Sequence, residues 1–310
     1  MTVSLCLRED KGEGRISGET RERVLNAVRE LGYRPNINAK RLRSGRSNVI
    51  ALYAGHGYLN VRSPYFAEIV SGLQEGCEIA RKDLLLHSAF HTAPSNDLLP
   101  ELLNGRVDGL IVDMYPNDPL RPRLVEADLF AVAISNELEG LPSVVVDDAS
   151  GGRMIAKHLF EAGHRKIAYV VGDVEPLSGL NRRLAFLEAA ADLGIQATVT
   201  PVDTEEDWGV AVNEAIDAGV TAMACWNDTY AREALVHLVR MGIDVPGKVA
   251  VTGFDGCPVP VIERFALTTI AAPWYEVAKS AVMTLSARLA GEAVPPKVVY
   301  PVRFIRGETS

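Results

Sequence analysis

The sequence predicts an α/β protein in which two doubly wound, parallel-sheet lobes follow a short all-α head. Three observations carry this prediction. From residue 49 onward, short apolar runs alternate with amphipathic stretches of helical period. The alternation occurs in two successive sets, which begin near residues 49 and 149. The first 48 residues differ from the rest in charge. Apolar strands separated by helices are typical of parallel sheets that are covered on both faces.

The charge of the chain is unevenly distributed. The first 48 residues contain 11 Lys and Arg against 6 Asp and Glu, whereas the remainder contains 21 against 34. The net charge of −8 therefore combines a basic head with an acidic body. This asymmetry indicates a phosphate-binding module joined to a module that binds a small molecule or a protein, although a basic terminus without such a role is the alternative.

The head contains one well-formed helix signal. Ser17 can cap a helix whose apolar residues recur at helical spacing, and Gly32 follows the expected end of that helix. A second, basic stretch covers residues 36–46 and is too short to be stable as an isolated helix. We expect this stretch to become ordered only against a partner; a basic linker is the alternative.

Seven apolar runs are the expected strands of the body. They cover residues 49–53, 84–86, 110–112 and 131–134 in the first set, and residues 166–171, 222–226 and 249–254 in the second. The stretch from residue 65 to residue 82 has one apolar face and predicts a helix after the first strand.

Polar residues recur directly after these apolar runs. They are Asp113, Ser135, Asn136, Asp147, Asp148, Asn227, Asp228 and Asp255. Any one of them could instead cap a helix or form a turn. Ligands of parallel sheets bind beyond the carboxyl ends of the strands, and two facing lobes place that site between them. The recurrence therefore predicts a polar cleft between the lobes.

Several classes of protein are disfavoured. No apolar run reaches the roughly 18 residues of a spanning helix, and the first residues lack the pattern of a signal peptide, so we expect a cytoplasmic protein without membrane contact. The four cysteines lie far apart in the sequence, which favours reduced thiols over disulfides. The six histidines form no pair typical of a metal-binding motif. We expect no metal.

An enzyme on a Rossmann-like sheet is one alternative. The sequence Gly55-His56-Gly57 after the first strand lacks the third glycine of a dinucleotide fingerprint. No Ser, His and Asp stand at the spacing of a nucleophile elbow. We therefore expect no catalytic residues and no cofactor.

Motifs along nearly the whole chain occur in the order found in one known family. They are SGETRERV (17–24), LGYRPN (31–36), AKRLRSG (39–45), PYFAEI (64–69), VDGLI (107–111), AGHRKIA (162–168), ND (227–228), GFD (253–255) and LTTI (267–270). Together these segments resemble the LacI family of bacterial transcription regulators.

The resemblance implies a domain organisation. It divides the chain into a partial helix-turn-helix DNA-binding head (1–34), a hinge helix with linker (35–48), an N-terminal effector lobe (49–148 plus about 275–300) and a C-terminal effector lobe (149–274 plus about 301–310). The lobes would have the fold of periplasmic binding proteins. The chain would act as a homodimer on a pseudo-palindromic operator, with hinge helices in the minor groove.

The resemblance also implies which residues contact operator DNA. They are Thr2 and Ser4 in the recognition helix, and Asn38, Ala39, Lys40 and Leu42 in the hinge, where Leu42 matches the leucine that wedges into a base step. The sequence departs from the family at its start, where the first helix of the motif is missing. We therefore expect residues 1–34 to be poorly ordered and to bind operator DNA weakly.

For the effector, the resemblance implies residues from both lobes. They are Tyr65, Phe66, Asp113, Ser135, Asn136, Arg182, Trp208, Asn227, Asp228 and Asp255. Arg182 matches an arginine that clamps the ligand, Asp255 an acceptor of ligand hydrogen bonds, and Trp208 an aromatic ring that lies against a sugar. Carboxylates, amides and an aromatic ring suit a sugar, whereas the pair Tyr65 and Phe66 would equally suit a stacked purine.

The expected function is that of a LacI-family transcriptional regulator, a repressor whose DNA binding is controlled by a sugar or sugar derivative bound between the lobes. Ligand-dependent closure would change the spacing of the two hinges in the dimer. A purine or nucleoside effector is the alternative within the family. A periplasmic-type sugar-binding protein without DNA binding is the alternative of another class.

Overall fold

The computed structural model of the chain describes residue 6 and residues 16–33, 45–55, 63–86, 98–127, 129–172, 175–257 and 266–310. The chain divides into two compact units, Met1–Ser47 and Asn48–Ser310. Within the described residues, no helix is both long and apolar enough to cross a membrane.

The first unit contains helix α2 (Gly18–Glu30). The Ser17 hydroxyl accepts a hydrogen bond from the backbone N–H of Thr20, which confirms the predicted cap. After the helix, Gly32 has a φ of +58°, a left-handed conformation that glycine adopts without steric cost. Of the predicted hinge helix and linker (35–48), residues 35–44 lie outside the described residues.

The first lobe is built on a parallel sheet. In the described residues its strand order is β11-β5-β4-β3-β1-β2. The strands are β1 (Val49–Ala54), β2 (Asp83–Leu86), β3 (Gly109–Asp113), β4 (Ala131–Ile134), β5 (Ser143–Val146) and β11 (Lys297–Tyr300).

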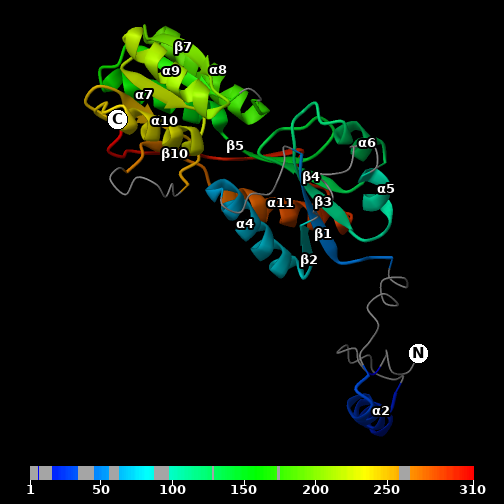
Figure 1. Cartoon of the computed structure of the whole chain (residues 1–310). Coiled ribbons are helices and arrows are strands. Elements are labelled where there is room, and N and C mark those ends of the chain that lie inside the picture. Colours follow the sequence, from blue (N-terminus) through cyan, green and yellow to red (C-terminus); the bar gives the residue numbers. More distant parts are fainter. Residues whose placement is uncertain are drawn as a thin grey trace. The chain divides into compact units, whose positions relative to one another are not determined.

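Helices cover both faces of this sheet (Figure 1). Helices α4 (Pro64–Ala80) and α11 (Trp274–Leu289) pack against each other on one face. Helices α5 (Leu98–Leu103) and α6 (Leu120–Glu126) contribute to the core on the other. The sheet is therefore doubly wound.

Strand β1 shows why these strands are continuously apolar. Ile50 and Leu52 belong to the core beneath α4 and α11, whereas Val49, Ala51 and Tyr53 belong to the core beneath α5 and α6. Successive side chains of a strand point to opposite faces, so a strand buried on both faces needs apolar residues at every position.

The second lobe repeats this design. Its parallel sheet has the order β7-β6-β8-β9 in the described residues. The strands are β6 (Lys166–Val171), β7 (Gln196–Pro201), β8 (Ala222–Cys225) and β9 (Ala250–Thr252). Helices α7 (Asp148–Glu161) and α8 (Leu177–Asp192) cover one face, and α9 (Glu205–Asp217) and α10 (Asp228–Arg240) cover the other.

The last residues of the chain contribute to both lobes. After β11 has joined the first sheet, β12 (Arg303–Ile305) pairs antiparallel with β10 (Thr269–Ala271), beside the second lobe. The predicted lobe boundaries stay a proposal. The place of β11 in the first-lobe sheet and of β12 beside the second lobe supports them.

The predicted α/β fold with two parallel-sheet lobes is confirmed. Each of the seven apolar runs overlaps a strand, and the predicted helix at residues 65–82 corresponds to α4. Strands β5, β7, β10, β11 and β12 were not predicted from the sequence.

Candidate functional site

A cavity of about 200 Å³ lies at the carboxyl ends of strands from both lobes. Its lining residues are Ser63, Tyr65, Phe66, Asp113, Tyr115, Ser135, Asn136, Pro176, Ser178, Arg182, Trp226, Asn227, Thr229, Asp255 and Trp274. Eight of the ten predicted effector residues are among them, all except Trp208 and Asp228. The structure thus brings these eight together, and their role in binding stays a prediction.

Tyr65 organises the first-lobe wall of the cavity. It lies in the first turn of α4, and its hydroxyl bonds to Asp113 Oδ2 at 2.8 Å and to Ser135 Oγ at 2.5 Å. Its ring meets the rings of Phe66 and Trp274 edge to face, with centroids 5.1 and 5.0 Å apart. Burial and the charge of Asp113 raise the pKa of Tyr65, so the phenol stays a neutral donor.

Arg182 organises the second-lobe wall. It comes from α8, and its Nε donates to Asp148 Oδ1 at 2.7 Å. Its Nη1 donates to the backbone oxygen of Trp226 at 3.1 Å and lies 3.5 Å from Asp255 Oδ1. The guanidinium also stacks on Phe254, 3.7 Å from the ring centroid. Arg182 is therefore held rigidly, and it is only 3% exposed.

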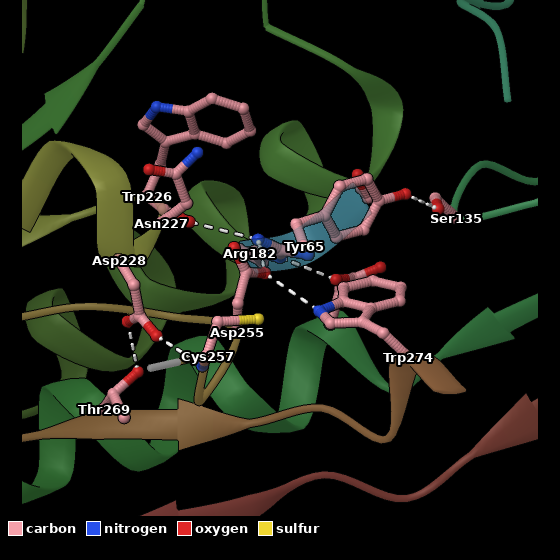
Figure 2. Close-up of polar contacts among 12 residues, drawn as sticks. Tyr65, Ser135, Arg182, Trp226, Asn227, Asp228, Asp255, Cys257, Thr269 and Trp274 are labelled. Atoms are coloured by element: carbon pink, nitrogen blue, oxygen red, sulfur yellow. Dashed lines mark hydrogen bonds and ion pairs between the residues drawn. The ribbon is translucent and has the colours of Figure 1, made fainter. Parts of the chain in front are cut away.

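Asp255 connects this wall to the first lobe (Figure 2). Its Oδ1 accepts from the indole N–H of Trp274 at 3.2 Å. Burial raises the pKa of the Asp255 carboxyl to about 8, because the attraction of Arg182 only partly offsets the desolvation and the repulsion from Asp228. Asp255 thus combines a buried carboxyl group of raised pKa with an inter-lobe contact.

Two lining residues have unusual backbone conformations. Ser135, after β4, has a φ of +66°, and Asp255, after β9, has a φ of +126°. Both values are unfavourable for residues with a Cβ, and such strain is typically found at functional sites. Their coincidence at one cavity supports its functional importance.

Asn136 bridges the lobes at another edge of the cavity. Its amide donates to the backbone oxygen of Met114 at 3.2 Å, and its Oδ1 accepts from the backbone N–H of Ser178 at 3.0 Å. Ser178 lies in the first turn of α8, whose N-cap residue Pro176 makes no side-chain capping bond. A first-lobe amide therefore satisfies an N–H at the start of a second-lobe helix.

Asn227 and Asp228 have different environments. Asn227 lines the cavity and caps α10 by accepting from the backbone N–H of Tyr230. Asp228 does not line the cavity; its carboxylate accepts from Thr269 Oγ1 at 2.5 Å and from the backbone N–H of Cys257 at 2.9 Å (Figure 2). The prediction for Asp228 is thus corrected, because these buried donors occupy its oxygens.

The prediction that Trp208 faces the ligand is also corrected. Trp208 is 6% exposed and belongs to the core beneath α9 and α10. Its ring stacks on His237, with centroids 6.0 Å apart and planes at 17°. Further aromatic residues that line the cavity were not predicted from the sequence. They include Trp226, directly after β8, and Trp274, at the start of α11. The position of Trp226 at a strand end was the available signal.

The predicted DNA-contacting residues Thr2, Ser4, Asn38, Ala39, Lys40 and Leu42 lie outside the described residues. Their roles stay predictions, as does the expected poor order of residues 1–34.

A second, larger concavity of about 610 Å³ has Asp148 among its lining residues. Residues of both lobes line it, including Glu137, Arg153, Glu188 and Lys297. None of its described lining residues is aromatic, and Lys297 pairs with Glu137. The smaller cavity, with its aromatic walls and converging polar groups, is therefore the better candidate for a specific ligand.

Two family models match the chain. A model described as periplasmic binding protein-like domain matches residues 156–310. A model described as bacterial regulatory proteins, lacI family, matches residues 1–36. The two matches agree with the division into a head and a two-lobed body.

Similar proteins match over nearly the whole chain. The transcriptional regulator CelR of Thermobifida fusca is 30% identical, over 92% of this chain and 87% of the relative. The transcriptional repressor PurR of Erwinia tasmaniensis is 29% identical, over 94% of this chain and 89% of the relative. A solved structure of a CelR–cellobiose complex is 27% identical, with a TM-score of 0.77 over 97% of this chain and 93% of the solved chain.

Proposed function

The chain belongs to the LacI family of bacterial transcriptional regulators, and on that premise we propose that the 200 Å³ cavity holds the small effector that controls its binding to operator DNA. The relatives are regulators of transcription and not enzymes. We also propose that the protein acts as a homodimeric repressor in the cytoplasm, where its operator would lie.

One observation carries the assignment of the cavity. Residues from different elements of both lobes, among them Tyr65, Arg182 and Asp255, converge on one small space with buried polar groups. A site of this kind can respond to a ligand only if the ligand interacts differently with two arrangements of the lobes. The contacts from Asn136 to Ser178 and from Trp274 to Asp255 join the lobes at the walls of the cavity. Ligand binding in the cavity would therefore shift the equilibrium between open and closed arrangements of the two lobes.

The effector that fits best is a sugar or sugar derivative. The cavity is smaller than the ~300–1,000 Å³ of sites for drug-sized ligands, which favours a ligand of monosaccharide size. Carboxylate, amide and hydroxyl groups next to aromatic rings suit a molecule with many hydroxyls and an apolar face. A purine remains the second candidate, because Phe66 and Trp226 offer aromatic surface and a repressor named PurR is among the relatives.

A thermal-shift screen of the full chain against D-galactose, D-glucose, D-ribose, cellobiose and hypoxanthine tests this proposal, since a ligand that binds the native state raises the Tm. Each hit is then repeated with Tyr65→Phe, which removes the hydroxyl that holds Asp113 and Ser135. We expect the shift to fall sharply in this variant.

Tyr53→Phe is the matched control. Its hydroxyl also donates to an aspartate of the first lobe, Asp118, at 3.0 Å, but neither residue lines the cavity. The control should keep the full shift. A shift that survives in Tyr65→Phe would place the ligand elsewhere and contradict the assignment. For a confirmed hit, a change in affinity for a selected operator fragment tests the control of DNA binding.

A further inference from the structure

Building on the proposed effector site, we infer that Trp226 determines the size of the effector. Its indole closes the cavity on the second-lobe side, so that the cavity admits a ligand with a single sugar ring or a single base and excludes ligands that carry a further ring. The proposed function names the site and the class of ligand, but it leaves open which side chain sets this limit.

The backbone of Trp226 is fixed at both of its polar groups. The residue directly follows β8, and its N–H donates to the backbone oxygen of Val170 in the neighbouring strand β6 at 3.0 Å. Its carbonyl oxygen accepts from Arg182 Nη1 at 3.1 Å (Figure 2). Both partners are buried. The indole therefore stands on a rigid base, which keeps it at the wall of the cavity.

The indole ring is packed between two helices of the second lobe. Tyr230 of α10 meets it edge to face, with ring centroids 5.6 Å apart and planes at 68°. On α8, Gly179 leaves room for the ring, because a Cβ at this position would lie only 3.1 Å from Trp226 Cε3. Any side chain at residue 179 would therefore press against the indole. Both contacts hold the ring by its shape.

The indole N–H of Trp226 is buried, and no described residue accepts a hydrogen bond from it. A buried tryptophan usually finds such an acceptor. The position of this ring is thus determined by packing and not by a hydrogen bond. Phenylalanine can replace the indole without loss of a polar contact, which provides a conservative variant for a test of its role.

Behind the indole, further aromatic rings lead away from the cavity. Trp226 lines the cavity, whereas Tyr230 and Trp208 do not. The ring of Tyr230 contacts that of Trp208, with centroids 5.7 Å apart, and Trp208 belongs to the core beneath α9 and α10. Trp226 therefore separates the cavity from this aromatic series. Without the indole, the cavity would extend to the ring of Tyr230.

The volume of the cavity makes this separation decisive for the ligand. A cavity of about 200 Å³ leaves little space beside a single sugar ring or base. A second ring directed toward Trp226 would overlap the indole, and extra atoms in a packed interior are unfavourable. An indole and a hexose unit are similar in size, so removal of the indole would create space for a further ring.

Titration calorimetry on the full chain measures this limit with sets of smaller and larger ligands. The sets are D-galactose with lactose and melibiose, D-glucose with cellobiose and maltose, and D-ribose and hypoxanthine with inosine, which joins these two. In the set that binds, the smaller member should bind at least ~10-fold more tightly than the larger members.

Variants of Trp226 assign the limit to this side chain. Trp226→Ala should reduce the preference for the smaller ligand by roughly tenfold, because the larger ligand then fits. The smaller ligand also loses contact area in this variant, so the ratio of the two affinities is the measure. Trp226→Leu retains more of the packing on Tyr230 and should reduce the ratio by less. Trp226→Phe keeps a ring at the wall and should preserve the preference.

Phe160→Ala is the matched control for a general loosening of the second lobe. Phe160, like Trp226, is a partly buried aromatic residue that packs against the same hydrophobic core cluster. It lies in α7, however, and does not line the cavity. This control should keep the preference of the unaltered chain. Thermal unfolding of each variant shows whether it is folded.

The outcomes separate this inference from the proposed function. Equal or tighter binding of a larger ligand to the unaltered chain overturns the size limit and leaves a ligand-controlled regulator standing. A preference that is unchanged in Trp226→Ala, or reduced as much in Phe160→Ala, overturns the role of Trp226 alone. Absence of binding by every member, in the unaltered chain and in the variants, overturns both proposals.

Discussion

Trp274 donates its indole N–H to Asp255 across the two lobes, over 3.2 Å, and both residues are more than nine-tenths buried. Trp274 begins a helix of the first lobe, and Asp255 follows the last strand of the second-lobe sheet. The ionisation of the Asp255 carboxyl therefore acts directly on the hydrogen bond from Trp274 that joins the two lobes.

Replacing Asp255 by Asn should change how stability depends on pH. Burial raises the pKa of Asp255 from its ordinary value to about 8, so between these values the folded chain holds a proton that the unfolded chain has lost. The contribution of Asp255 to stability is therefore present at low pH and is lost as the pH rises through about 8. Asn cannot ionise. In urea unfolding from pH 5 to 9, the stability of the variant relative to the unaltered chain should rise with pH; parallel curves would contradict the assignment.

Replacing Arg182 by Ala should destabilise the second lobe strongly. The substitution leaves Asp148 buried without its 2.7 Å partner, and breaking a buried ion pair in this way costs about 3–5 kcal/mol. Asp148→Asn in the same chain should recover part of the loss, because it removes the uncompensated charge. Urea unfolding of both single variants and the double variant measures the coupling. Strictly additive losses would show that the pair does not interact energetically.

Gly152→Ala should destabilise the contact between α7 and α8. A Cβ at this position would lie 2.2 Å from the backbone oxygen of Arg182, so the helices would have to separate, at a cost of about 1–3 kcal/mol. Gly209→Ala is the matched control within α9, where a Cβ would meet no atom within 4 Å. There, alanine should be neutral or stabilising by up to ~1 kcal/mol, because it favours the helix. Equal Tm values for the two variants would refute the close approach at Gly152.

Asn136→Ala should weaken the start of α8. The N–H of Ser178 then loses the acceptor that Asn136 provides from the other lobe, and loss of a helix cap typically costs ~1 kcal/mol. Hydrogen exchange at the first turn of α8 should become faster in the variant than in the unaltered chain. Unchanged exchange at Ser178 would mean that this inter-lobe bond does not persist in solution.

The fold could be predicted from apolar runs wherever strands are buried on both faces. Strand β7 was not predicted, because it forms an edge of its sheet and is not buried on both faces. Its sequence Gln-Ala-Thr-Val-Thr-Pro therefore mixes polar and apolar residues. Strands β10 and β12 were not predicted because each has only three residues. Periodicity cannot detect elements so short, whose pairing depends on segments distant in the sequence.

The candidate site could be predicted in part because strand ends are recognisable. Asp113, Ser135 and Asp255 directly follow apolar runs, and parallel sheets gather such positions at one edge. The depth of a side chain on a helix could not be predicted in this way. Trp208 follows the capping box that starts α9, and the rotation of that helix turns its ring toward the core. Trp226 could have been found by its position directly after β8, whereas Trp274 reaches the cavity through the packing of the lobes, which no local pattern encodes.

Strands β11 and β12 are separated by only two residues, Pro301 and Val302, yet β11 is an edge of the first-lobe sheet, whereas β12 pairs with β10 in a two-stranded sheet beside the second lobe. One hydrophobic core cluster likewise contains residues of both sheets, such as Ile50 and Tyr169. Neither lobe can consequently be excised as one continuous piece of chain. Cutting the chain before β11 would remove both β11 from the first-lobe sheet and β12 from its pairing with β10, so we expect residues 48–310 to melt as a single cooperative unit and not lobe by lobe.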